Sequence, residues 1–230
     1  MSKKTVYLLP GLGATVHAFD KLEFPGYERK GIKWLKPKEN EDLPQYAKRL
    51  SSQIEDPENS ILCGLSFGGI VAVELAKILP VEKTILISSV KTRREFPNTI
   101  KMARTIPLHK LIKADRVSKF QFWYWFPFGK TTDEDKALIK SMVDVIDGPF
   151  TDWCANQAVY WKNKTVPKNL YHIHGTADRV FPFFHIKNYY KVRGGTHFMI
   201  VNRADEINEY IKEILSLKSQ TAKTKQNEKV

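Results

Sequence analysis

Short apolar runs alternate with amphipathic stretches along most of this 230-residue chain. Six runs have the length and composition of buried strands: Val6–Leu9, Ile32–Leu35, Ser60–Cys63, Lys83–Ser88, Asn169–His174 and Tyr189–Val192. Four stretches between and after them predict helices: Leu43–Ile54, Ile70–Leu79, Trp153–Trp161 and Ala204–Leu217. Strands that alternate with helices in this way are typical of an α/β fold with a parallel sheet.

Residues 91–152 interrupt the alternation. They carry helical patterns near Ile100–Ile112 and Asp133–Ile146, and an aromatic cluster lies between these, from Phe120 to Phe128. A segment of about sixty residues is longer than an ordinary connection. We therefore expect a core formed by residues 1–90 and 153–217, an insertion at 91–152 and a disordered, lysine-rich tail at 218–230.

The composition indicates a soluble globular protein, with 42% apolar and 27% charged residues. The two cysteines exclude a disulfide framework and fit a reducing compartment. The first residues lack the apolar run of a secretory signal, and no stretch approaches the roughly 18 apolar residues of a membrane helix. The expectation is a cytoplasmic protein.

One short motif carries the chemistry. Gly64–Gly68 reads Gly-Leu-Ser-Phe-Gly, which matches G-x-S-x-G, and it lies between a predicted strand and a predicted helix. This is the context of a nucleophile elbow, in which a sharp turn exposes the serine, here Ser66, above the sheet. The helix N-terminus at this point favours a developing negative charge.

A serine nucleophile needs a base, and the base needs an orienting acid. Asp178 follows the fifth predicted strand, and His197 follows the sixth. Because the carboxyl ends of parallel strands meet at one edge of the sheet, both side chains should lie on the same side as Ser66. The chain order Ser66, Asp178, His197 is that of an α/β-hydrolase triad.

The sequence resembles the α/β-hydrolase superfamily over about residues 5–215. The resemblance depends on four loops: Pro10–Gly13, Gly64–Gly68, Gly175–Pro182 and Gly195–His197. It implies that Ser66 is the nucleophile, His197 the general base and acid, and Asp178 the carboxylate that orients the imidazole. It also implies an oxyanion hole formed by the backbone N–H groups of Leu12 and Phe67.

The same resemblance implies a reduced, mostly parallel sheet of about six strands, flanked by helices, with residues 91–152 as a helical cap over the active site. Asp178 and His197 are only 19 residues apart, which is shorter than usual in this superfamily. The helix between them should therefore be reduced to about one turn within Phe183–Asn188.

Other interpretations of single residues are weaker. Gly11 and Gly13 could begin a dinucleotide fingerprint, but Val16 stands where Gly or Ala is expected, and Lys36-Pro37-Lys38 provides no acidic residue for a ribose. Three aspartates could replace Asp178 but do not follow a strand: Asp144, Asp147 and Asp152. His172 and His174 lie on one face of the fifth predicted strand and could form a metal pair, but a packed or hydrogen-bonded pair is the favoured interpretation. His17 follows the Pro10–Gly13 loop and could border the site, but a surface turn residue is favoured. Ser88 and Ser89 could line the site or bond to backbone groups at the end of their strand.

The net charge of +12 is concentrated in one segment. Residues 91–130 hold ten basic and two acidic side chains, whereas residues 1–90 are almost balanced. Nine basic residues would surround the entrance beneath the cap: Lys91, Arg93, Arg94, Lys101, Arg104, Lys110, Lys113, Arg116 and Lys119. They could attract an anionic substrate or a membrane surface, or form a solvated helix face. No nucleic-acid-binding module is recognisable, so we expect no nucleic-acid partner.

These observations predict a serine hydrolase that cleaves a carboxylic ester of a small or medium-sized substrate through an acyl-enzyme intermediate. The reaction needs no cofactor and no metal. The same triad would also serve an acyltransferase, a thioesterase or a lyase, because a fold and a triad do not determine the acceptor. A non-catalytic ligand-binding protein is the alternative outside catalysis.

Overall fold

The computed structural model describes residues 4–104 and 148–217. The aromatic cluster between Phe120 and Phe128, the predicted helix Asp133–Ile146, most of the proposed cap and the lysine-rich tail lie outside the described residues. So do two of the three alternative acids, Asp144 and Asp147.

Six parallel strands form one sheet: β1 (Thr5–Leu9), β2 (Glu28–Gly31), β3 (Ser60–Leu65), β4 (Lys83–Ile87), β5 (Leu170–Gly175) and β6 (Tyr190–Val192). Their order across the sheet is β2-β1-β3-β4-β5-β6, and every neighbouring pair is parallel. The central strands β1, β3 and β4 are fully buried, as their continuous apolar runs predict. The predicted six-stranded parallel sheet is confirmed.

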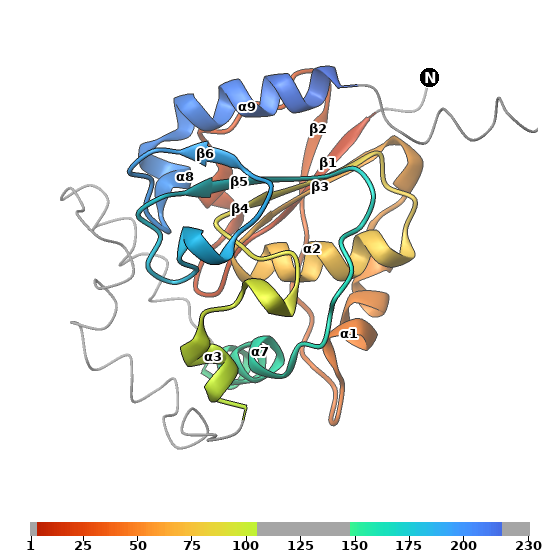
Figure 1. Cartoon of the computed structure of the whole chain (residues 1–230). Helices are drawn as coiled ribbons and strands as arrows, with labels where there is room; N and C mark the ends of the chain where they lie inside the picture. Colours follow the sequence, from red (N-terminus) through yellow and green to blue (C-terminus); the bar gives the residue numbers. More distant parts are fainter. Residues whose placement is uncertain (1–3, 105–147, 218–230) are drawn as a thin grey trace, which may run out of the picture.

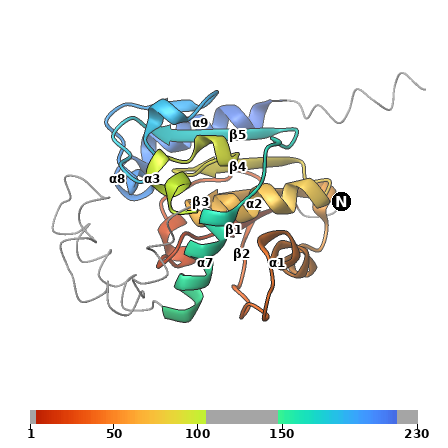
Figure 2. The ribbon, with the colours of Figure 1, turned by 60° about the horizontal axis from the view of Figure 1, so that its bottom comes forward.

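Helices cover both faces of the sheet (Figure 1). The α-helices are α1 (Leu43–Leu50), α2 (Phe67–Ile78), α3 (Asn98–Met102), α7 (Gly148–Tyr160), α8 (Met199–Asn202) and α9 (Ala204–Ser216). Short 3-10 turns lie at Val16–Phe19, Ser51–Gln53, Pro57–Asn59, Arg93–Glu95 and Phe183–His185. Helices α8 and α9 lie on one face, whereas α1, α2 and α7 lie on the other, where Figure 2 shows α7 in front of α2. None of the described helices combines the length and the apolar character needed to cross a bilayer.

Alternate residues of the strands supply two hydrophobic cores. Val6 and Leu8 of β1 face the core beneath α9, and Tyr7 and Leu9 face the core beneath α1 and α2. The second core continues into α7 through Cys154, which is fully buried. Helix α7 is therefore anchored to the sheet domain by packing.

The second strand differs from the prediction. It is Glu28–Gly31 rather than Ile32–Leu35, and it pairs with β1 from Thr5 to Leu8 at the edge of the sheet. An edge strand is only half buried, so its polar sequence Glu-Arg-Lys-Gly gives no apolar signal. The apolar residues after it belong to a loop, in which Leu35 exchanges two backbone hydrogen bonds with the Tyr46 hydroxyl of α1.

Helix boundaries differ from the prediction in two places. Helix α1 begins with a capping box between Asp42 and Gln45, and its last predicted turn tightens into the 3-10 turn Ser51–Gln53. Helix α7 starts at Gly148, five residues before the predicted Trp153. Only the first part of the predicted helix Ile100–Ile112 is described, as α3.

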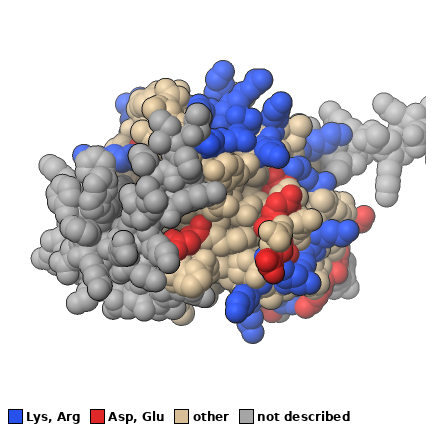
Figure 3. All heavy atoms as spheres, turned by 90° about the horizontal axis from the view of Figure 1, so that it is seen from below, with Lys and Arg blue, Asp and Glu red and all other residues tan. Residues whose placement is uncertain are grey.

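Charged side chains do not form one continuous surface on the face of the molecule that Figure 3 shows. In Figure 3, Lys and Arg gather along the upper edge and at the lower right, and uncharged surface with acidic groups beside it lies between them. Lys91, which the sequence analysis places at the cap entrance, is buried. The basic charge on this face is therefore divided among separate patches.

The turn between β3 and α2 packs backbone to backbone against the loop that follows β1. A Cβ atom on Gly68 would lie 2.1 Å from the Leu9 carbonyl oxygen and 2.4 Å from that of Pro10. Such distances are far below van der Waals contact, so only glycine allows the start of α2 to approach β1 this closely.

Gly68→Ala should lower the free energy of unfolding by about 3 kcal/mol, because the added methyl group meets backbone that cannot move without shifting β1. Gly26→Ala is the matched control: its φ of 82° costs about 1 kcal/mol in strain, but nothing lies within 4 Å of the new Cβ. Urea denaturation of both variants gives the two losses, and equal losses would contradict the close approach at Gly68.

Candidate active site

Ser66 is held in a strained backbone conformation directly between β3 and α2, with φ 52° and ψ −120°. Its N–H donates to the Ile87 carbonyl of β4 over 3.0 Å. Its carbonyl accepts from the Ser89 hydroxyl over 2.7 Å and from the Gly69 N–H over 3.0 Å. These bonds fix the turn in a region that costs a non-glycine residue about 1–3 kcal/mol. Ser89 therefore has the backbone-bonding role.

His197 joins Ser66 to Asp178. Its Nε2 lies 3.0 Å from the Ser66 hydroxyl oxygen, and its Nδ1 lies 2.9 Å from Asp178 Oδ2. A carboxylate only accepts, so Nδ1 carries the proton and donates it, which leaves Nε2 to accept from the serine hydroxyl. The structure thus brings the three predicted residues into one hydrogen-bonded series in the order that proton transfer from the serine requires.

Asp178 is an ionised carboxylate in a buried position. Its side chain is 0% exposed, and Oδ1 accepts from the backbone N–H groups of Val180 and Phe181, each over 2.9 Å. Burial opposes ionisation, but the adjacent His197 and these hydrogen bonds outweigh it and lower the pKa of Asp178 below its usual value. The negative charge therefore faces the imidazole at neutral pH.

Two crossing loops bring Asp178 and His197 together. Thr176 N–H donates to the Val192 carbonyl over 3.0 Å, and Ala177 N–H donates to the Gly195 carbonyl over 2.9 Å. A Cβ on Gly175 would lie 2.1 Å from that Gly195 oxygen, so glycine is required where the loops touch. The connection from Asp178 to β6 contains only the 3-10 turn Phe183–His185, which confirms the predicted shortening of the helix there.

Two backbone N–H groups near Ser66 have no acceptor among the described residues: those of Leu12 and Phe67. Phe67 is the first residue of α2, so its N–H belongs to the positive end of the helix. Leu12 follows Gly11, whose added Cβ would lie 3.1 Å from Ser66 Cβ. Free N–H groups at these two positions are what an oxyanion hole requires.

A buried polar cluster lies behind the triad. His174 Nε2 donates to the Phe181 carbonyl over 2.8 Å and lies 3.7 Å from Asp178 Oδ2. The ring centroid of His172 is 5.0 Å from that of His174. His172 Nδ1 accepts from Lys91 Nζ over 3.1 Å, and Lys91 forms an ion pair with Glu95 over 3.0 Å. Burial lowers the pKa of both histidines, that of His172 well below its usual value, and also lowers the pKa of Lys91.

No group of three His, Cys, Asp or Glu residues within the described ranges could hold a metal ion. His172 Nδ1 and His174 Nε2 have hydrogen-bond partners, whereas the buried His172 Nε2 and His174 Nδ1 have none in the described part of the chain. Sequence reasoning missed the roles of Lys91 and Glu95. Their four-residue spacing was a weak signal, because it is common in exposed turns and helices.

The structure also describes where His17, Asp152 and Cys63 lie. His17 is exposed and pairs with Asp20 over 3.0 Å, as expected of a surface turn residue. Asp152 lies on α7 and not at the end of a strand, and the two ring nitrogens of His197 bond to Asp178 and Ser66. Cys63 is fully buried, and burial raises the pKa of its thiol, so it acts as a small apolar residue in the core.

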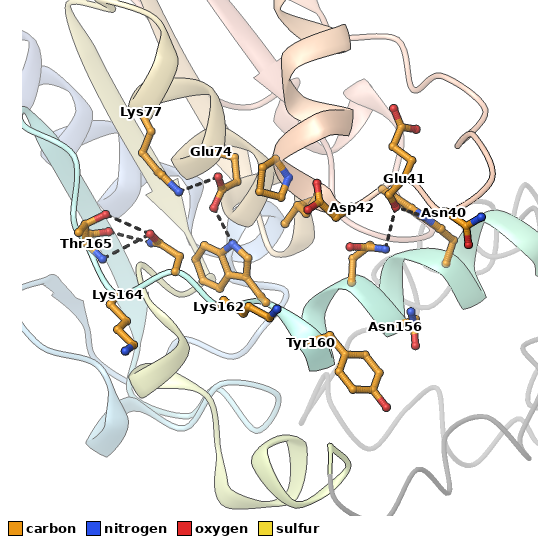
Figure 4. Close-up of a pocket in the computed structure, with 16 residues that line it drawn as sticks. Asn40, Glu41, Asp42, Glu74, Lys77, Asn156, Tyr160, Lys162, Lys164 and Thr165 are labelled. Atoms are coloured by element: carbon orange, nitrogen blue, oxygen red, sulfur yellow. Dashed lines mark hydrogen bonds and ion pairs between the residues drawn. The ribbon is translucent and has the colours of Figure 1, made fainter.

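Two large hollows open on the α7 side of the described structure. One, of about 770 Å³, lies between α7, α1 and α2 (Figure 4). Its main polar groups bond to each other: Glu74 accepts from Trp161 and Lys77, and Gln157 donates to the Glu41 carbonyl. These bonds attach α7 to the core. The other hollow, of about 960 Å³, begins at Pro10 and Gly11 beside Ser66.

No family model and no curated protein sequence matches this chain. Solved structures do. A hydrolase from Pseudomonas aeruginosa PA01 matches with a TM-score of 0.68 at 16% identity, covering 94% of this chain and 91% of that protein. A lipase-esterase related protein from Clostridium acetobutylicum ATCC 824 has a TM-score of 0.65 at 17% identity, with 93% and 95% covered. A bromoperoxidase from Bacillus anthracis has a TM-score of 0.66 at 17% identity, with 94% and 93% covered.

The neutral buried histidines should make stability depend on pH. Unfolding lets His172 and His174 bind protons below their ordinary pKa of about 6.5, whereas the folded chain keeps them neutral to lower pH. Between pH 7.5 and 5.5 the free energy of unfolding should therefore fall, by up to about 1.4 kcal/mol per pH unit below 6.5 for each histidine. His172→Gln should reduce this slope in urea denaturation.

The control is Tyr189→Phe, because the Tyr189 ring contacts both histidines and does not titrate in this range. It should leave the slope unchanged. A wild-type free energy that stays constant from pH 7.5 to 5.5 would show that the histidines are not held neutral.

Proposed function

We propose that this chain, which has the α/β-hydrolase fold, is a serine hydrolase that cleaves a carboxylic ester of a small or medium-sized substrate. The observation that supports this most is the hydrogen-bonded series from Ser66 through His197 to the buried Asp178. Three loops far apart in the sequence meet at one edge of the sheet to form it. Esterases and lipases among the structural neighbours agree with the proposal.

The first half of the proposed reaction acylates the enzyme. Ser66 Oγ attacks the ester carbonyl carbon while His197 Nε2 takes its proton, and Asp178 stabilises the resulting imidazolium. The negative charge that develops on the carbonyl oxygen is stabilised by the N–H groups of Leu12 and Phe67. The tetrahedral intermediate collapses when His197 returns the proton to the departing alcohol oxygen.

The second half releases the acid. Water replaces the alcohol, and its oxygen attacks the acyl carbon while His197 Nε2 removes its proton. The second tetrahedral intermediate collapses when His197 returns the proton to Ser66 Oγ, which breaks the acyl–Ser66 bond. A thioesterase would follow the same steps with a thiol leaving group, and an acyltransferase would use another acceptor in place of water. A neighbour described as a bromoperoxidase shows that this fold by itself does not determine the chemistry.

Residues 91–152 remain our proposed cap. The described parts of this segment support it: Ile100 and Arg104 line the same small crevice as Val159 and Trp161, so the segment of α3 lies against the end of α7. Both lie on the α2 side of the sheet. A cap there would limit the access of water to the acyl-enzyme.

A fluorophosphonate probe should label the protein at Ser66, because a serine bonded to a histidine base attacks phosphorus as it attacks a carbonyl. Mass spectrometry of the labelled peptide locates the adduct. Ser66→Ala should abolish labelling, whereas Ser89→Ala, which removes a neighbouring hydroxyl, should still be labelled. Labelling that persists in Ser66→Ala would overturn the assignment of the nucleophile.

Asp178→Asn should reduce kcat for a p-nitrophenyl ester by about 10⁴-fold, as expected when the triad acid can no longer fix the imidazole tautomer. The amide oxygen can keep the bonds from Val180 and Phe181, so the fold should persist, which near-ultraviolet circular dichroism checks. Asp152→Asn on α7 is the matched control and should retain wild-type kcat. Near-normal turnover in Asp178→Asn would mean that another acid serves the histidine.

A further inference from the structure

The hollow beside Ser66 is a cleft with two walls. It starts at the Pro10–Gly11 loop and runs between the end of β2 with the loop after it, residues 31–39, and the first turns of α7, which contribute Pro149, Phe150, Thr151 and Trp153. Gly11 is the connection to the nucleophile, because its added Cβ would touch Ser66 Cβ at 3.1 Å. Ser66 does not itself line the cleft, so a substrate held at Ser66 would extend past Gly11 into this space of about 960 Å³, which is enough for a small organic molecule.

Aromatic rings lead from the nucleophile into this cleft. Phe67 follows Ser66 in the chain, and its ring centroid lies 6.3 Å from that of Trp34. Trp34 lies 6.1 Å from Phe150, and Phe150 stacks on Trp153 at 6.2 Å with an interplanar angle of 15°. The three rings that line the cleft, Trp34, Phe150 and Trp153, offer an apolar surface to the substrate.

Three lysines line the β2 side of the same cleft: Lys33, Lys36 and Lys38. All three are exposed, and no described carboxylate lies within ion-pair distance of their ammonium groups. Glu39 is the one acidic residue among those that line the cleft. This side of the cleft therefore carries a net positive charge that the described part of the chain leaves unneutralised.

The backbone of this lysine loop is fixed although its ammonium groups are not paired. Lys33 N–H donates to Gln53 over 3.0 Å, the Lys36 carbonyl accepts from Arg49 over 2.9 Å, and Lys38 N–H donates to Glu41 over 2.9 Å. Arg49 also holds the Glu41 carboxylate in an ion pair of 2.6 Å, so that carboxylate is neutralised by its own partner. The loop thus presents three cations from a constrained backbone beside an apolar wall.

We propose that the cleft binds an ester that carries a carboxylate, joined to the scissile carbonyl through an apolar spacer. The spacer lies along Trp34 and Phe150, and the carboxylate pairs with Lys33, Lys36 and Lys38. This inference rests on the proposed esterase function, because it places the scissile carbonyl at Ser66. It assigns the substrate's charge to the loop after β2, and not to the basic residues of the cap.

The test compares p-nitrophenyl monoesters of dicarboxylic acids with p-nitrophenyl esters of monocarboxylic acids of equal length, from four to ten carbons. At low ionic strength the anionic ester should have a kcat/KM about tenfold higher at its best length. A combined Lys36→Gln and Lys38→Gln variant should remove this preference, by lowering kcat/KM for the anionic ester about tenfold more than for the neutral ester. The matched control is Lys164→Gln with Lys168→Gln, two exposed lysines in the segment that leads to the start of β5. It should keep the preference.

The carboxylate could belong to the acyl part or to the alcohol part of the ester. A second pair, 4-acetoxybenzoate and phenyl acetate, places it on the alcohol. A preference in either pair that is lost in the combined Lys36→Gln and Lys38→Gln variant supports the inference. It also shows whether the acyl part or the alcohol part of the ester carries the carboxylate. Equal kcat/KM for charged and neutral esters in both pairs, or a preference that survives the lysine substitutions, overturns it.

Failure of this inference is distinguishable from failure of the proposed function. Ester hydrolysis that depends on Ser66 but shows no charge preference overturns only the inference. If no ester is hydrolysed, isothermal titration of Ser66→Ala with suberate still decides it: binding that is weakened about tenfold in the lysine variant supports the anionic cleft, and absence of binding overturns it.

Discussion

The site depends on the backbone contact between the β3–α2 turn and the loop that follows β1. Gly68 allows the start of α2 to touch the carbonyl oxygens of Leu9 and Pro10, and this contact sets the position of three groups together. It holds Ser66 in its strained turn, places the Leu12 loop beside it, and fixes where the cleft begins. Nucleophile, N–H donors and cleft are therefore positioned by one packing constraint, and their mutual geometry does not depend on flexible side chains.

The sequence predicts most of the sheet and the three residues that meet at its edge. Central strands are buried on both faces, so β1, β3 and β4 appear as continuous apolar runs, and the glycine-rich loops after them indicate where side chains converge. Strand β2 could not be predicted from apolar runs, because an edge strand needs no apolar face and here reads Glu-Arg-Lys-Gly. The burial of Lys91 depends on His172, 81 residues away, and no local pattern reports such a contact.

The loop after β2 shows how one misassigned element hides a functional surface. As a predicted strand, Ile32–Leu35 would point its apolar residues into the core. The lysines after it would then only show that this position has no acidic residue to bind a ribose. As a loop, the same residues place Trp34 in an aromatic wall and leave three lysines along its side. The error of four residues in the position of β2 thus concerns substrate selection more than it concerns the fold.

The hydrogen bond between Ser66 and His197 joins residues that are 131 positions apart. Asp178 and His197 lie in the loops that follow β5 and β6, so this bond requires both strands to be in place in the sheet. Without them the serine lacks its base and is chemically an ordinary hydroxyl. The reactivity of Ser66 thus depends on the last two strands of the sheet, and a chain in which they are unpaired holds the serine without its base.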